Sequence, residues 1–390
     1  MRLVALLGLA AALAVGAVVL LRAPSPVPPT LAVVDALGGS SAGFARALAP
    51  RPFVFPADHG PHPEFRTEWW YYTGNLQGAD GRHFGFQLTF FRIALAPDMI
   101  VRASAWASRQ AYLAHFALTD TAGRRFSASS RLSRAALGLA GAQAQPFKVW
   151  VEDWSAEGGA DAPEGVGGEA VPVRLRAAQD DTAIDLTLAS AKPVVLQGER
   201  GLDRKGEEPG NASHYYSLTR MPANGRVTVG GAAFDVSGLA WMDREWSTSS
   251  LGAGLVGWDW FALQLGDGRD LMLYQLRRAD GSPDRFSGGS LVEADGTSRR
   301  LTRADFTIEV RDTWTSPRGG TRYPSRWRLT VAGEALELDV VPRLADQELA
   351  LAVRYWEGAV RVEGRARGRP VAGAGYVELV GYARAEGGTR

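Results

Sequence analysis

The stretch that decides the fold of this chain is WYYTGNLQGADGRHFGFQLTFFR, residues 70–92, together with its diverged counterpart WDWFALQLGDGRDLMLYQLRR, residues 258–278. Each copy contains an alternating apolar and polar segment, a turn rich in Gly and Asp, and a second alternating segment. This order is typical of a β-hairpin. Because solenoid repeats recur every ~20–50 residues, two copies so far apart indicate two related domains.

Short alternating segments separated by turn residues continue through most of the chain. They include Ala111–Leu118, Val171–Leu175, Ala183–Leu188, Gly225–Val229, Phe306–Val310, Trp327–Val331, Ala335–Val341, Ala359–Val362 and Tyr376–Gly381. Only Ser127–Leu137 has the pattern of a helix. Many short strands favour sandwiches or barrels, and two domains of about 170 residues have the size of small ligand-holding barrels. The sequence therefore predicts an all-β fold of two tandem β-barrel domains with few short helices.

The composition is that of an ordinary soluble globular protein, with 46% hydrophobic and 22% charged residues. The 43 basic and 42 acidic side chains nearly cancel, and no run of five like charges occurs. This balance argues against a nucleic acid as partner. The chain contains no cysteine, which excludes disulfides, thiolate metal ligands and a thiol nucleophile.

The N-terminus has the pattern of an export segment. Arg2 precedes an apolar stretch, Leu3–Leu21, and a proline-rich segment follows. Val15-Gly16-Ala17 offers a cleavage site, but the stretch is also long enough to span a bilayer. We therefore expect residues 1–22 to be a signal peptide or an N-terminal membrane anchor, and the protein to be periplasmic or anchored facing the periplasm.

The composition also divides the rest of the chain. Residues 23–50 are rich in Pro and Ala and are predicted to be a flexible linker. Globular sequence begins near Phe53. With one hairpin copy in each half, we predict an N-terminal barrel domain over residues 51–235 and a C-terminal barrel domain over residues 236–390.

Residues 58–72 bring two histidines, three acids and five aromatic residues together. A strand through Trp69 and Trp70 places one ring inside a barrel and the other outside. One interpretation makes Trp70 and Tyr72 core residues. The other places Glu68 and the inward tryptophan at the mouth of a cavity.

The same segment raises the question of a metal site. His59 and His62 would need a third ligand, such as Glu64 or Glu68. The two histidines lie in a loop interrupted by prolines, which lacks the rigid placement of known zinc motifs. We therefore predict no metal.

A second group of ionisable residues lies in SHYYSLTR, residues 213–220, and LAWMDREW, residues 239–246. In a strand, His214 and Tyr216 share one face, and Trp241, Asp243 and Glu245 share another. If both faces line one barrel cavity, a histidine and two carboxylates meet inside an aromatic wall. A carboxyl there has a raised pKa and can act as a general acid.

A simpler interpretation of the same residues stays open. Asp243-Arg244-Glu245 can form a salt-bridged turn, with His214 as a packing residue. Against it, ionisable groups among large aromatic residues are costly to bury without a partner or a purpose. The chain has no Gly-x-Ser-x-Gly elbow, phosphate-binding glycine loop or dinucleotide fingerprint, so the corresponding enzyme classes have no support.

Four motifs in order carry a resemblance to a known family. They are FPADHG (residues 55–60), EWWYYTG (68–74), SHYYS (213–217) and WMDREW (241–246). Over residues 51–390 the chain resembles the AttH-like, carotenoid 1,2-hydratase (CrtC) family of lipocalin-like proteins, often labelled predicted secreted hydrolases. The resemblance implies two lipocalin-like barrels packed side by side and no dissociable cofactor.

The resemblance also implies roles for single residues. Characterised relatives add water across an isolated carbon–carbon double bond of a carotenoid. Their proposed catalytic residues are a His-x-aromatic pair and an aromatic-x-Asp pair, which fall here on His214 with Tyr216 and on Trp241 with Asp243. The two aromatic residues are exchanged relative to the family pattern.

Two functions are consistent with these observations. In the first, an exported protein binds an apolar lipid or terpenoid, and the family resemblance adds an ABC-type transporter as a partner. Its predicted ligand-binding residues are Glu68, Trp69, Trp70, Tyr72, Glu245 and Trp246. In the alternative, a hydratase-like enzyme, Asp243 is oriented by His214 and protonates an alkene, while aromatic rings stabilise the resulting cation. Both functions assume that His214 and Asp243 line the same hollow.

Overall fold

The computed structural model describes residues 41–97, 104, 106–158, 172–249 and 251–383. The predicted signal peptide or anchor, residues 1–22, lies outside this part, as does most of the predicted linker. Within the described ranges, no helix has the length and apolar character needed to cross a membrane.

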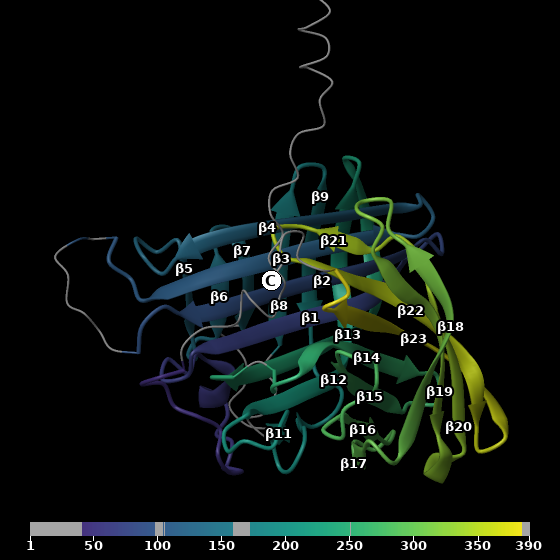
Figure 1. The fold of residues 1–390 in the computed structure, drawn as a ribbon. Coiled ribbons are helices and arrows are strands. Elements are labelled where there is room, and N and C mark those ends of the chain that lie inside the picture. Colours follow the sequence, from purple (N-terminus) through teal and green to yellow (C-terminus); the bar gives the residue numbers. More distant parts are fainter. Residues whose placement is uncertain (1–40, 98–103, 105, 159–171, 250, 384–390) are drawn as a thin grey trace, which may run out of the picture.

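Antiparallel strands in two sheets make up almost all of the regular secondary structure of the described chain (Figure 1). The first sheet contains β1 (Thr67–Gly78), β2 (His83–Ala94), β3 (Gln110–Asp120), β4 (Arg125–Arg134), β5 (Ala140–Gln143), β6 (Lys148–Val151), β7 (Trp154–Gly158), β8 (Val173–Gln179), β9 (Thr182–Leu188), β10 (Val195–Leu196), β11 (Leu202–Arg204), β12 (Ala212–Val229) and β13 (Ala232–Ser247). Its spatial order is β4-β3-β2-β1-β13-β12-β9-β8-β7-β6-β5, with β10 and β11 paired to β12. This sheet curls into a nearly closed barrel around its own apolar core.

The second sheet contains β14 (Leu255–Leu265), β15 (Asp270–Arg278), β16 (Gly288–Val292), β17 (Ser298–Thr302), β18 (Phe306–Thr315), β19 (Arg322–Val331), β20 (Leu336–Pro342), β21 (Glu348–Ala350), β22 (Arg354–Ala366) and β23 (Arg369–Val380). Its order is β17-β16-β15-β14-β23-β22-β20-β19-β18, with β21 paired to β22. It forms a half-barrel around a second core. The all-β prediction with two tandem barrel-like units is confirmed.

The repeated hairpin lies at the centre of each sheet. β1 pairs with β2, and β14 pairs with β15, as the alternation predicts. The first strand of each hairpin also pairs with the last strand of its own sheet, β1 with β13 and β14 with β23. Backbone hydrogen bonds therefore join the first and the last strand of each sheet in chain order.

Two details differ from the sequence prediction. The predicted helix Ser127–Leu137 is wrong, because its first eight residues belong to the edge strand β4, which pairs with β3 from Asp120 opposite Arg125 to Ala111 opposite Arg134. The helices of the described residues are two short 3-10 turns, η1 (Ala57–His59) and η2 (Ala332–Glu334). The first sheet continues through β13 to Ser247, past the predicted division between residues 235 and 236.

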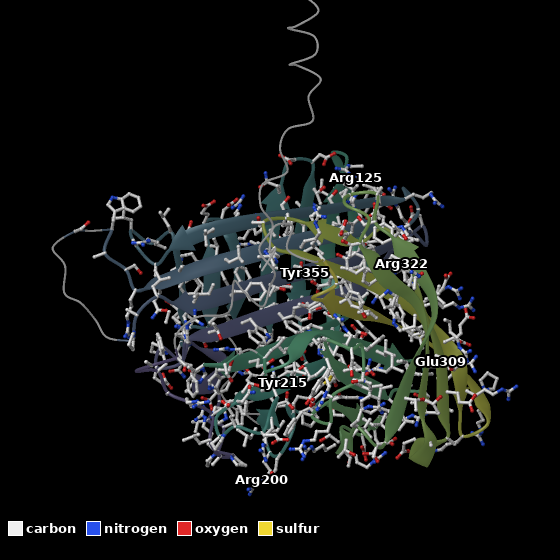
Figure 2. The ribbon with its side chains drawn as sticks, in the orientation of Figure 1. Arg125, Arg200, Tyr215, Glu309, Arg322 and Tyr355 are labelled. Atoms are coloured by element: carbon white, nitrogen blue, oxygen red, sulfur yellow. The ribbon has the colours of Figure 1, made fainter. Side chains whose placement is uncertain are left out.

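Several strands at the junction of the two domains are buried on both faces. In β12, Tyr216 packs in the core of the first barrel, and its neighbour Tyr215 belongs to a cluster between the domains. In β14, Phe261 packs in the second core, and Trp260 joins the same interdomain cluster. Figure 2 shows Tyr215 in the middle of the molecule, far from the peripheral Arg125, Arg322 and Glu309.

A buried ion group joins β1, β2 and β13 on the barrel side of the first sheet. The Glu68 carboxylate pairs with the guanidinium groups of Arg92 and Arg244, and all three side chains are almost completely buried. The His62 Nδ1 lies 3.3 Å from Glu68 Oε2. Burial acts to raise the pKa of Glu68, but the charges of Arg244 and Arg92 hold it well below its usual range. Glu68 therefore fixes the packing of β1 against β2 and β13.

We predict that Glu68→Gln lowers the free energy of unfolding by roughly 3–5 kcal/mol, because it leaves two buried guanidinium groups without a counter-charge. Urea denaturation at pH 7 measures the change. Glu64→Gln is the matched control, since Glu64 is exposed in the same segment. Equal stability of the two variants would contradict a structural role for the Glu68 ion group.

Candidate functional site

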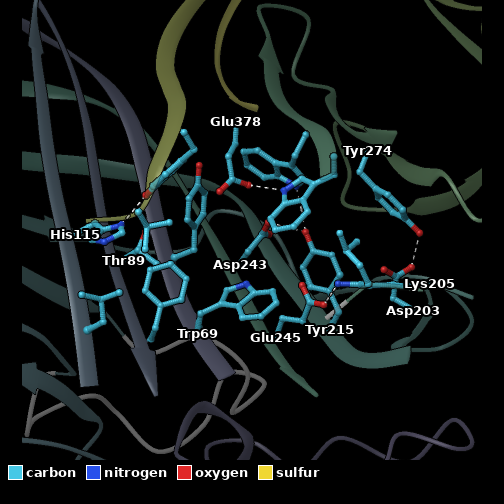
Figure 3. A pocket seen from close by; sticks show the side chains of 18 of the residues that line it. Trp69, Thr89, His115, Asp203, Lys205, Tyr215, Asp243, Glu245, Tyr274 and Glu378 are labelled. Atoms are coloured by element: carbon cyan, nitrogen blue, oxygen red, sulfur yellow. Dashed lines mark hydrogen bonds and ion pairs between the residues drawn. The ribbon is translucent and has the colours of Figure 1, made fainter. Parts of the chain in front are cut away.

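A pocket lies between the two domains, against the outer faces of the central strands (Figure 3). Its cavity volume is about 110 Å³. Strands β1, β2, β3, β12 and β13 form one wall, and β14, β15, β22 and β23 form the other. Aromatic rings dominate both walls, among them Trp69, Tyr215, Trp258 and Trp260.

Strand register brings the polar residues of the pocket together. Asp243 lies directly opposite Tyr71 on β1 and opposite Ser217 on β12. Glu245, two residues further along the same face, lies opposite Trp69 and Tyr215. Because side chains alternate along a strand, all of these residues point to the pocket side of the sheet.

The Asp243 carboxyl accepts three hydrogen bonds from neutral donors. The Tyr215 hydroxyl donates to Oδ2 over 2.6 Å, the Ser217 hydroxyl donates to Oδ1 over 2.6 Å, and the Trp241 indole N–H donates to Oδ1 over 2.7 Å. The Trp260 indole N–H in turn donates to the Tyr215 hydroxyl over 3.4 Å. An indole N–H is only a donor, so this order directs the Tyr215 proton toward Asp243.

Burial and hydrogen bonding act on Asp243 in opposite directions. Burial raises the pKa of the carboxyl to about 7, and the hydrogen bonds from Ser217, Tyr215 and Trp241 limit the rise. Asp243 consequently populates both its protonated and its ionised form at neutral pH. A group in this state can give a proton to a bound molecule or take one from it.

Three more carboxyl groups line the pocket. Burial raises the pKa of Glu378 to about 7, and the Trp258 indole N–H donates to its Oε2 over 2.8 Å. Burial also raises the pKa of Asp203 to about 6, and the Tyr274 hydroxyl donates to its Oδ1 over 2.6 Å. Glu245 forms an ion pair with Lys205.

The wall formed by the first sheet also carries a buried histidine. His115 on β3 lies with its Nδ1 2.7 Å from the Tyr355 hydroxyl of β22. Burial lowers the pKa of His115 to about 4, so its imidazole is neutral at pH 7. This contact links the two domains directly across the pocket wall.

His214 and Tyr216 lie on the other side of the sheet from Asp243. The His214 ring packs against Phe53, Phe65 and Trp246. The Tyr216 hydroxyl lies 2.6 Å from His59 Nδ1. The prediction that His214 orients Asp243 inside one hollow is therefore wrong, because residues 214 and 243 project from opposite faces of paired strands.

The alternative of a salt-bridged turn at residues 243–245 is wrong as well. All three residues lie within β13 and alternate between its faces. Arg244 points into the first barrel toward Glu68, and Glu245 points to the pocket and pairs with Lys205. The described ion pairs include none for Asp243.

The predicted ligand-binding residues divide between the same two faces. Trp69 and Glu245 line the interdomain pocket. The side chains of Glu68, Trp70, Tyr72 and Trp246 lie within the first barrel instead. Trp241 packs in the interdomain cluster and reaches the pocket through its hydrogen bond to Asp243.

The two loop histidines considered as metal ligands contact aromatic residues of the first barrel. His62 stacks on the Trp246 ring at a centroid distance of 3.8 Å and lies between Asp58 and Glu68. Among the residues that the structure describes, no three His, Asp or Glu side chains are placed to share one metal ion.

Sequence reasoning missed Tyr215, Trp260, Lys205, His115 and Glu378 as pocket residues. Tyr215 and Trp260 carried a usable signal, because aromatic residues that occupy both faces of a strand indicate burial on both sides. The other three come from strands and loops without a distinguishing pattern, and only the tertiary structure brings them to the pocket.

The raised pKa of Asp243 predicts a pH effect on stability. Between about pH 4 and pH 7 the folded state holds a proton that the unfolded state has released, so stability falls as the pH rises. Relative to Asp243→Asn, the wild type should lose up to about 4 kcal/mol of unfolding free energy over this range. Denaturation series at several pH values measure the difference. The unfolding free energy of the exposed Asp312→Asn variant should change with pH as that of the wild type does. The same pH dependence in Asp243→Asn would contradict the raised pKa.

Comparison with known proteins adds the family. The profile of the AttH-like family matches residues 46–382. A Nitrosomonas europaea protein assigned to AttH superposes with a TM-score of 0.76 at 34% sequence identity, covering 87% of this chain and 100% of that one. Kievitone hydratase from Nectria haematococca shares the fold, with a TM-score of 0.66 at 15% identity, covering 88% of this chain and 97% of that one. No curated protein sequence matches. The profile match and the Nitrosomonas relative together show that this chain belongs to the AttH-like family.

Proposed function

We propose that this protein binds an apolar small molecule, of lipid or terpenoid type, in the pocket between its two domains. The observation that carries the proposal is the pocket itself, which has walls of aromatic and aliphatic side chains and a few polar groups that converge at Asp243. Pockets of this composition, mostly apolar with a few convergent polar groups, are typical of small-molecule sites in proteins.

The interior of the first barrel is a poor alternative site. Its core is filled by large side chains such as Trp70, Tyr72, Phe84 and Trp154, each with essentially no exposed surface. A guest there would have to displace packed rings, which costs several kcal/mol for each one. The proposed ligand therefore lies outside the barrel, against the faces of β1, β12 and β13.

Binding of an uncharged apolar fluorophore, N-phenyl-1-naphthylamine, tests this location. We expect saturable 1:1 binding that Leu251→Trp weakens at least tenfold, because the larger side chain fills the pocket that Leu251 lines. Leu132→Trp is the control, since Leu132 is exposed on the outer surface of β4. His214→Phe should leave the affinity for the fluorophore unchanged. A lower affinity in this variant would place the ligand in the barrel instead.

A second candidate function is acid-catalysed hydration of an alkene, and the state of Asp243 favours it. A protonated Asp243 would transfer its proton to one alkene carbon and leave a carbocation at the other. Trp260, Tyr215 and Trp69 would stabilise that cation, at about 0.5–2 kcal/mol for each ring. A water molecule would add its oxygen to the cation and return a proton to the carboxylate, so that the net change is addition of water.

The hydration candidate predicts that Asp243→Asn abolishes turnover, because the amide cannot supply the proton. Incorporation of ¹⁸O from labelled water into an acyclic terpenoid with a trisubstituted double bond measures the reaction. The wild-type rate should fall as the pH rises through about 7, as Asp243 loses its proton. Asp312→Asn should retain the rate. Turnover by Asp243→Asn would exclude Asp243 as the acid.

The cellular setting stays a prediction from the sequence. Export to the periplasm, a tether through the N-terminus and service to an ABC-type transporter are compatible with a ligand-binding role. Detection of a stoichiometric apolar compound in protein purified from its own cells would support a carrier over an enzyme.

A further inference from the structure

We propose that the ligand of the interdomain pocket carries a positively charged nitrogen, a quaternary ammonium or a protonated amine, on its apolar body. This inference rests on the proposed ligand-binding function and adds the chemical class of the guest. It follows from the balance of charged groups around the cavity and from the aromatic faces beside them.

Carboxyl groups outnumber cationic side chains in the pocket wall. Asp203, Asp243, Glu245 and Glu378 line the cavity, and Lys205 is the single lysine or arginine among the lining residues. Lys205 is already paired with Glu245. The other three carboxyl groups receive hydrogen bonds from hydroxyl and indole groups, and the described ion pairs include no cation for any of them.

These neutral donors orient the carboxyl groups without neutralising their charge. Trp241 and Trp258 are donors only, and each has its N–H directed at a carboxyl oxygen. An ionised carboxylate in a buried site without a counter-charge is unfavourable. A cationic guest would supply the missing charge to Asp243 and Glu378 without new protein contacts.

The aromatic wall suits the same guest. Organic ammonium groups bind over the faces of Trp and Tyr rings, and several such rings around one site recognise quaternary ammonium ligands. The pocket already contains one such arrangement, with the Lys205 Nζ 5.5 Å from the centroid of the Trp69 ring. Trp258 and Trp260 offer further ring surface on the opposite wall.

An anionic guest fits this pocket poorly. Its charge would meet carboxyl groups on both walls, and the one ammonium group is occupied. Arginines gather in a separate hollow on the far side of the Asp203–Tyr274 hydrogen bond, which is lined by Arg204, Arg285 and Arg300. These three arginine side chains therefore line a different hollow from the pocket that takes the apolar body.

Three ligands with the same ten-carbon chain separate these possibilities: decyltrimethylammonium, decanol and decanoate. Isothermal titration calorimetry of the full chain at pH 7.5, with each ligand below its micelle concentration, gives the three affinities. We expect the ammonium compound to bind at least tenfold more tightly than decanol, and decanoate to bind most weakly. In Glu378→Gln and in Asp243→Asn, the preference for ammonium over decanol should fall at least threefold.

Glu363→Gln is the matched control, because it removes an exposed carboxylate from β22, outside the pocket, and should keep the wild-type preference. Equal affinity for the ammonium compound and decanol would overturn the inference and leave the proposed apolar site intact. Tighter binding of decanoate than of the ammonium compound would overturn it in favour of an anionic guest. Absence of binding by all three ligands would overturn the proposed function together with the inference.

Discussion

The architecture depends on strands that are buried on both faces. β1, β12 and β13 separate the packed core of the first barrel from the space between the domains, and each supplies side chains to both. Because successive residues point to opposite sides, a shift of one residue in register would exchange the two sets completely. The ion pairs of Glu68 with Arg92 and Arg244 link β1 to β2 and β13 on the barrel side, and they oppose such a shift.

Glu68 and Asp243 show how neighbours decide the state of a buried carboxyl group. Both are buried and lie on paired strands, so desolvation acts on both in the same direction. Two guanidinium groups hold the pKa of Glu68 well below its usual range, whereas Asp243 has only neutral donors and its pKa is raised to about 7. The same strands thus place a permanent charge in the barrel and an exchangeable proton in the pocket.

The sequence was sufficient for the fold and for part of the site. Alternation and turn residues predicted the two hairpins, and the motif around Asp243 identified a carboxyl group that does line the pocket. The pairing of His214 with Asp243 failed because periodicity shows which residues share a face but not which faces meet. Glu378 comes from a strand more than a hundred residues away from Asp243, and no local pattern marks it. Ser127–Leu137 failed because pairing with β3 outweighs local helix preference.

The position of the pocket at the junction has a thermodynamic consequence. One wall belongs to each sheet, and contacts such as that of His115 with Tyr355 already cross the boundary. A guest that contacts both walls would stabilise the association of the two halves. Its binding free energy would add to the free energy of their contact. By linkage, separation of the halves would weaken binding of such a guest by the same free energy by which the guest opposes separation, so release and separation would be coupled.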